Sequence, residues 1–187
     1  MRGFANVIGF DDAPFPPKKI GPVPVVGAVF ASRRFEGILV GQVERDGVDA
    51  AARLSDLVSK SRSAEHIQLV LLQGITMAGF NVVDVFALHD SLRVPVLVVS
   101  RKLPNVERFR DALTRHIPGG ISRWAIVERL GPMEPMGSVY VQRVGIDQEK
   151  AAAVLRNLTI YGNIPEPLRT AHIIAGGLAE GHSRGSV

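Results

Sequence analysis

The sequence predicts a single α/β domain over residues 1–187, in which helices flank a mixed sheet. Three strands follow one another at the start, and two continuous apolar runs then alternate with helices. A chain of 187 residues can bury a sizeable core as one domain. With 46% apolar and 21% charged residues, its composition is that of a folded globular protein and not of a disordered one.

The first three predicted strands lie before residue 45. The first covers residues 5–11 and ends at two adjacent acids, Asp11 and Asp12. A proline-rich stretch follows and must be a loop, because proline lacks the N–H that a strand needs. The next two strands begin at Val25 and Phe35, with a hairpin over residues 30–35. This order predicts an antiparallel meander.

The middle of the chain alternates helices with buried strands. The segment HIQLVLLQ is apolar almost throughout, which is typical of a strand buried on both faces of a sheet. The predicted elements are a helix starting at Asp49, a strand ending at Gln73, a helix over residues 81–92, a strand starting at Val94 and a helix over residues 105–116. A meander followed by alternating helix and parallel strand is the ribonuclease-H-like plan. Another mixed α/β sheet remains the alternative from the pattern alone.

The C-terminal third is less regular. Residues 124–127 and 138–144 are predicted as strands around a turn rich in glycine and proline. Asp147 is the expected N-cap of a helix that carries Val154 and Leu155. A last helix is expected to start at Pro167, since proline is favoured in the first helical turn.

Composition excludes several classes of site. The chain has no cysteine, which rules out disulfides, zinc–thiolate centres and cysteine nucleophiles. No apolar run reaches the roughly 18 residues of a membrane helix, and the N-terminus does not resemble a signal peptide. We therefore expect a cytoplasmic protein. The net charge of +4 is compatible with a phosphate-rich partner, although the excess is small.

Three positions are candidates for metal chemistry. Asp11 ends a central strand, where ligands usually bind in open α/β sheets, although an exposed loop acid would have the same sequence pattern. Asp49 is most simply a helix N-cap. If its helix packs on the first strand, however, Asp49 and Asp11 could share one Mg²⁺, with Asp46 as a substitute. Gln73 ends the buried strand, and its neutral amide can bind a metal through its carbonyl oxygen but contributes no charge, where a third acid would be expected.

Four residues are candidates for contact with phosphate. Lys18 and Lys19 follow Asp12 in the proline-rich loop, where they could equally be solvated. Arg169 and His172 lie three residues apart on the last helix and share a face, which is also a common arrangement on a helix surface. The small residues of segment 74–81 would let a ligand approach the backbone, or simply form a turn. The chain contains no P-loop, dinucleotide fingerprint or HExxH motif.

Several segments together resemble one archaeal protein family. They are GFDDAPF, RDGVDA, LLQGITMAGFNVVD, VPVLVVSRK and IPEPLRTAHIIAGGLAEGHSRG, and they extend from Gly9 to Arg184. This family, domain of unknown function ninety-nine, is endonuclease-dU-like and similar to endonuclease V. The run PEPLRTA at residues 165–171 is also similar to one near the C-terminal end of endonuclease V.

The resemblance implies a ribonuclease-H-like fold and Mg²⁺- or Mn²⁺-dependent cleavage of nucleic acid near a deaminated base. It implies that Asp11 and Asp49 bind the metal and that Gln73 completes the site, although endonuclease V has Glu at the position of Asp49 and an acid at that of Gln73. The rival prediction is a homologue that binds nucleic acid without cleaving it, because Gln73 replaces the expected acid. A third is an unrelated small-molecule site at the same sheet edge.

Overall fold

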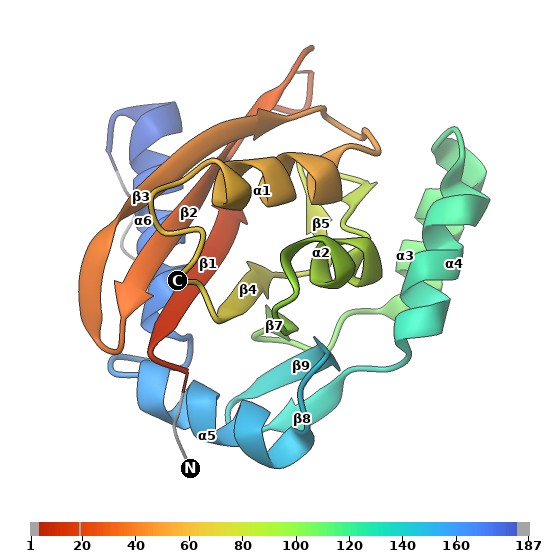
Figure 1. Cartoon of the computed structure of the whole chain (residues 1–187). Coiled ribbons are helices and arrows are strands. Elements are labelled where there is room, and N and C mark those ends of the chain that lie inside the picture. The colour runs from red at the N-terminus through yellow and green to blue at the C-terminus, as the bar shows by residue number, and fades with distance from the viewer. Residues whose placement is uncertain (1–3, 19, 183–187) are drawn as a thin grey trace.

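The computed structural model describes residues 4–18 and 20–182, which form a seven-stranded sheet with helices on both faces (Figure 1). The sheet contains β1 (Asn6–Asp12), β2 (Val23–Ala31), β3 (Arg34–Val43), β4 (Leu69–Gln73), β7 (Val96–Ser100), β8 (Glu134–Met136) and β9 (Val139–Val144). A separate two-stranded hairpin consists of β5 (Thr76–Met77) and β6 (Asn81–Val82). The helices are α1 (Ala50–Ser59), α2 (Val85–Leu92), α3 (Val106–His116), α4 (Gly120–Leu130), α5 (Gln148–Leu158) and α6 (Glu166–Glu180).

The strand order is β3-β2-β1-β4-β7-β9-β8. β1, β2 and β3 are antiparallel neighbours, which confirms the predicted meander. β1, β4 and β7 are parallel, and β9 and β8 continue the sheet in antiparallel pairing. Phe10 pairs with Leu72, so the next residues along the two strands, Asp11 and Gln73, are neighbours at the carboxyl edge of the sheet.

Two apolar cores cover the two faces of the central strands. Because side chains alternate along a strand, Ile8 and Phe10 join one core while Val7 joins the other. Side chains of α1 and α2 belong to the first core and side chains of α5 to the second. Helix α6 contributes Ala171 and Ala175 to the first core and Leu168 to the second. Leu69 and Leu71 of β4 also belong to the second core, so Asp11 and Gln73 continue the row of side chains on the α6 side of the sheet.

The close approach of α6 to β1 depends on Gly9. A Cβ atom at this position would lie 2.6 Å from the backbone carbon of Pro167 and 2.8 Å from the nitrogen of Leu168. Both atoms belong to the first turn of α6 and are not able to move aside as a flexible side chain would. The absence of a side chain at Gly9 thus lets α6 lie directly on β1, with Leu168 and Ala171 fully buried beneath it.

Two of the predicted elements differ from those in the structure. Residues 124–127, predicted as a strand, lie within α4, where Trp124 packs against the ring of Phe109 at 6.5 Å. That prediction was wrong because tertiary contact decides the conformation of a short apolar run that propensity leaves open. Within the predicted helix 81–92, the first two residues instead form β6, and helix α2 begins only at Val85, where Asp84 accepts hydrogen bonds from the N–H groups of Phe86 and Ala87.

Other predicted elements are confirmed. Asp147 caps α5 by accepting a hydrogen bond from the N–H of Lys150 at 2.8 Å. Residues 138–144 contain β9, and α6 starts one residue before Pro167. Within residues 4–18 and 20–182, no helix combines the length and the apolar character needed to cross a membrane.

The substitution Gly9→Ala tests the role of the α6 contact. We expect it to destabilise the protein by about 1–3 kcal/mol, as overpacking of a close contact typically does. Gly177→Ala is the matched control, since a Cβ there meets no atom within 4 Å and alanine is favoured over glycine inside a helix. Urea denaturation would measure both, and an equal stability of the two variants would contradict the argument.

Candidate functional site

The centre of the candidate site is a pair formed by Asp11 at the end of β1 and His172 of α6. His172 Nδ1 donates a hydrogen bond to Asp11 Oδ2 at 2.8 Å, and the N–H of Asp12 donates to Asp11 Oδ1 at 3.0 Å. The Asp11 side chain is 8% exposed, whereas that of His172 is 42% exposed. The pair therefore has a buried acid and an imidazole that solvent or a ligand can reach.

The pair is electrostatically coupled. Hydrogen bonding to Asp11 raises the pKa of His172 above its ordinary value, and this effect outweighs the opposing effect of burial. Burial raises the pKa of Asp11, although the hydrogen bond and charge of His172 oppose this. The hydrogen bond and charge of Asp11 both favour the imidazolium form of His172 and so hold its pKa above the ordinary value.

Asp12 is directed toward the β5–β6 turn. Its Oδ2 accepts a hydrogen bond from the N–H of Ala78 at 2.9 Å, a residue held at a left-handed φ of 48°. Burial and the charge of Asp11 raise the pKa of Asp12 to about 6. Two neighbouring carboxyl groups with raised pKa values form a place where added positive charge is stabilised.

A surface hollow of about 500 Å³ lies against this pair of acids. Asp11, Asp12 and His172 form one part of it, and residues of the following loop and of the last turns of α6 form the rest: Ala13, Pro14, Phe15, Gly176 and Glu180. The hollow gives a ligand direct access to the exposed imidazole.

Gln73 occupies the neighbouring position on β4. Its Oε1 atom is buried and has no hydrogen-bond partner. An unpaired buried acceptor is unfavourable unless a donor or a cation supplies the missing interaction. At the position where a third acid was expected, beside Asp11, the site therefore has an unpaired amide oxygen.

Asp49 belongs to a different network. Its Oδ1 accepts hydrogen bonds from Asn81 Nδ2 at 2.8 Å and from the N–H of Glu44 at 3.1 Å, and Arg53 donates to its Oδ2. Burial acts to raise the pKa of Asp49, but these hydrogen bonds together lower it. Within the parts of the chain that the structure describes, no hydrogen bond or ion pair joins Asp49 to Asp11.

The predicted N-cap position of Asp49 at the start of α1 is confirmed, but its side chain does not make the expected capping hydrogen bond. Asp49 stands at the N-cap position without a side-chain capping bond, and Oδ1 of Asn81 instead accepts from the N–H of Ala50 at 3.2 Å. Asn81 is fully buried and was missed as a structural residue, although a lone amide in the apolar segment FNVV was the available signal. Asp46 accepts from the N–H of Phe80 at 2.8 Å and so also holds the β5–β6 turn.

The predicted phosphate-binding residues do not form a single cluster. Arg169 lies one turn before His172, and its guanidinium donates to both carboxylate oxygens of Glu166 at 2.8–3.1 Å. Its charge is therefore balanced within α6. Lys18 is exposed in the loop after β1, and Lys19 lies outside the described residues.

The residues at Asp11 are compatible with a weakly held divalent cation. No group of three or more acidic, histidine or cysteine side chains suited to a metal occurs among residues 4–18 and 20–182. Mg²⁺, however, keeps several waters and often takes only one or two carboxylates from a protein. Asp11 and the orphaned Gln73 oxygen, with Asp12 adding negative charge, suit such an ion; Asp49 does not contribute through any contact in this structure.

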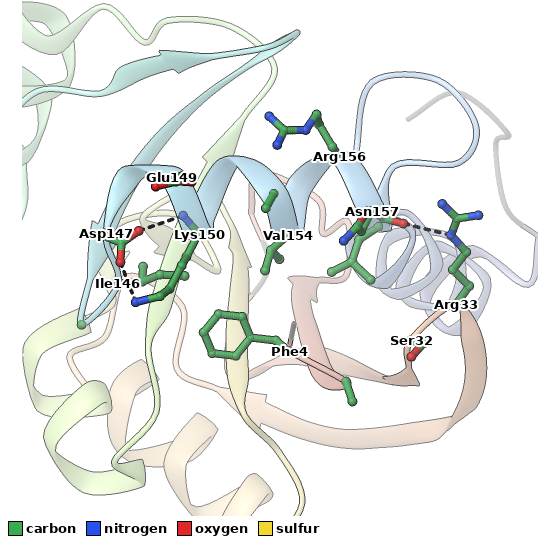
Figure 2. A pocket seen from close by; sticks show the side chains of 14 residues that line it. Phe4, Ser32, Arg33, Ile146, Asp147, Glu149, Lys150, Val154, Arg156 and Asn157 are labelled. Carbon is green, nitrogen blue, oxygen red and sulfur yellow. Dashed lines mark hydrogen bonds and ion pairs between the residues drawn. The ribbon is translucent and has the colours of Figure 1, made fainter. Parts of the chain in front are cut away.

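A larger hollow of about 1040 Å³ lies elsewhere, between the start of β1 and helix α5 (Figure 2). Phe4 and Val154 are directed into it. Two of the cations that line it have partners, since Lys150 pairs with Asp147 at 2.7 Å and Arg33 donates to the carbonyl of Asn157 at 3.1 Å. Despite its size, this hollow lacks the arrangement of acid, imidazole and unpaired oxygen found at Asp11.

Comparison of the sequence with known protein families identifies the family of this chain. The sequence model of the endonuclease dU family matches residues 4–179. The chain belongs to this family. Endonuclease dU relatives include the UPF0215 proteins of Deinococcus radiodurans, 49% identical over 97% of this chain and 92% of the relative, and of Methanothermobacter thermautotrophicus, 41% identical over 100% and 93%.

Solved structures confirm the predicted fold. A crystal structure of an Archaeoglobus fulgidus protein matches with a TM-score of 0.86 and 34% identity, covering 92% of this chain and 97% of that one. Human endonuclease V matches with a TM-score of 0.55 and 18% identity over 92% and 83% of the two chains. A Ciona intestinalis endonuclease V bound to inosine-containing DNA matches at 0.56 and 14%, over 89% and 82%. This endonuclease dU chain therefore has the ribonuclease-H-like fold of endonuclease V.

Titration of His172 tests the pair. The variant Asp11→Asn should lower the pKa of His172, because it removes the carboxylate charge that favours the imidazolium. Nuclear magnetic resonance of the imidazole, recorded in EDTA, measures this, and Asp56→Asn is the control because its exposed carboxylate pairs with Lys60.

The same substitution should change how stability depends on pH. A histidine whose pKa is raised by folding contributes stability that is complete below its unfolded pKa of about 6.5 and is lost as pH rises through the folded value. The parent protein should thus lose more of this contribution on that rise than Asp11→Asn does. An unchanged His172 titration in Asp11→Asn would mean that the pair is not formed in solution.

Proposed function

We propose that the protein is a metal-dependent endonuclease that hydrolyses a phosphodiester bond in nucleic acid containing a deaminated base. The observation that carries the proposal is the Asp11–His172 pair at the carboxyl edge of the sheet, beside the unpaired oxygen of Gln73. Membership of the endonuclease dU family supports nucleic acid as the substrate. Inosine in the DNA bound to the Ciona enzyme is the basis for proposing a deaminated base.

The chain's own residues suggest how the reaction would proceed. Asp11 and Gln73 would hold Mg²⁺ or Mn²⁺, which supplies charge stabilisation at the phosphate and lowers the pKa of bound water. Asp11 fixes the ring of His172 through Nδ1, so that Nε2 is left to donate a proton or a hydrogen bond to a phosphate oxygen in the hollow. Lys18 and, less directly, Arg169 are candidates for contact with the strand on either side.

A second candidate function is binding of nucleic acid without cleavage. The observation that favours it is Gln73, since an amide supplies a dipole where an acid would supply a full negative charge. The fold and the basic residues would be retained in such a homologue. The two functions differ in whether the parent protein hydrolyses a strand, so one set of assays separates them.

Cleavage assays test the first proposal. Purified protein is incubated with strands containing uracil, inosine or xanthine, with Mg²⁺, Mn²⁺ or EDTA. We expect the parent to cleave at least one modified strand, and we expect this cleavage to require the metal. The cleavage rate should fall by about 100-fold or more in Asp11→Asn, which is the lower end of the range for loss of general acid–base catalysis. Asp56→Asn controls for a general effect of losing a carboxylate. Metal-independent cleavage, or full activity of Asp11→Asn, would refute the proposal.

Substitution of Gln73 tests its role in the site. Gln73→Asp adds a negative charge next to Asp11 and should tighten Mg²⁺ or Mn²⁺ binding measured by calorimetry. Gln73→Glu controls for side-chain length, because Asp is one methylene shorter than Gln. Cleavage gained by either variant but lacking in the parent would show that the parent has lost nuclease activity through Gln73, as the second candidate function requires. If neither these variants nor Asp11→Ala changes metal affinity, the residues are not a metal site.

A further inference from the structure

The positive charge of the chain is concentrated in one segment. Residues 101–130, which we name the α3–α4 hairpin, comprise a short connection after β7 and the helices α3 and α4. The segment contains seven Lys and Arg residues against three Asp and Glu, a net charge of +4. The whole chain also has a net charge of +4, so the remainder is electrically balanced. The charge excess is therefore a local property of this hairpin.

Four cations at the start of the hairpin are exposed. They are Arg101, Lys102, Arg108 and Arg110. Across the described ranges, none of the four forms an ion pair, although other arginines do. Arg110 lies over the ring of Trp124, with its guanidinium carbon 5.8 Å from the ring centre. Such arginines are free to bind an anion from solution.

The hairpin begins next to the candidate site. Arg101 directly follows Ser100, the last residue of β7, and β7 pairs with β4 so that Val99 lies beside Gln73. β4 in turn pairs with β1. β7 therefore lies two strand spacings, about 10 Å, from β1. Arg101, the first cation of the hairpin, follows β7, while Asp11 lies on β1. The charge of Arg101 also acts on the pKa of His172.

Direct contacts fix the hairpin to the turn that Asp12 holds. The ring of Phe80, at the end of the β5–β6 turn, stacks on Phe109 of α3 with centres 6.0 Å apart. Arg123 of α4 donates through Nη1 to the carbonyl of Phe80 at 2.9 Å. Figure 1 shows α3 and α4 side by side at one side of the molecule, beyond α2. Helices α3 and α4 of the hairpin therefore contact the same turn that Asp12 contacts.

We propose that the α3–α4 hairpin binds the phosphate backbone of a nucleic-acid strand through Arg101, Lys102, Arg108 and Arg110 and leads that strand to Asp11 and His172. The proposal rests on the proposed function, since it assigns a binding surface to the same substrate. Unpaired arginines that continue from the end of a sheet strand track a phosphate backbone, and an arginine over a half-buried tryptophan combines charge with a flat surface for a base.

The experiment compares two double variants that lose the same charge. Arg108→Gln/Arg110→Gln removes two hairpin cations, while Arg62→Gln/Arg156→Gln removes two exposed arginines, one just before β4 and one on α5 near the hollow of Figure 2. Binding of fluorescein-labelled single strands, in DNA and RNA versions that contain inosine, is measured by anisotropy between about 50 and 200 mM salt. Thermal unfolding confirms that both variants are folded.

The hairpin variant should bind about ten-fold more weakly, and its plot of log affinity against log salt should flatten by about 1.4, or about 0.7 per lost phosphate contact. The Arg62/Arg156 control should retain the slope of the parent. Equal effects of the two double variants, or no effect of the hairpin variant, would overturn the hairpin proposal while leaving the proposed function intact. If the parent binds neither DNA nor RNA, the proposed function fails, and the hairpin proposal fails with it.

Discussion

The contact between α6 and β1 positions the Asp11–His172 pair at the centre of the candidate site. Leu168 and Ala171 are fully buried against the sheet, and Gly9 leaves room for the first turn of the helix to lie directly on the strand. The helix then runs along β1 until His172 meets Asp11. A side chain at Gly9 would push α6 away from β1 and would lengthen the 2.8 Å hydrogen bond between His172 and Asp11, so the pair depends on the packing at Gly9.

Polar contacts of the β5–β6 turn extend this arrangement to the rest of the edge. Asp12 accepts a hydrogen bond from Ala78, whose left-handed backbone is otherwise unfavourable for a residue with a side chain, and Asp46 accepts one from Phe80. Asn81 joins the same turn to the start of α1. The acids that looked like metal ligands in the sequence therefore divide between two tasks. Asp11 faces a ligand-accessible hollow, whereas Asp46 and Asp49 hold backbone and side-chain donors.

Gln73 lies beside Asp11 and supplies an amide oxygen where an acid was expected. Its position beside Asp11 follows from the pairing of β1 with β4, and its unpaired buried oxygen is the feature that a bound cation or its water would satisfy. A neutral oxygen offsets less of the dehydration cost of Mg²⁺ than a carboxylate does. This difference between amide and acid is the physical basis on which the two proposed functions, cleavage and binding without cleavage, are distinguished.

The sequence alone determined the order of the main elements and the residues at the strand ends. The apolar run before Gln73 and the meander before Asp49 depend on local pattern, which is why these strands and the polar residues at their ends, Asp11 and Gln73, could be predicted. Only the tertiary structure decided that His172 pairs with Asp11, since 161 positions separate them along the chain. It also decided that Asp49 joins Asn81 and that residues 124–127 are helical, because burial and partner geometry outweigh the local preference of a short segment.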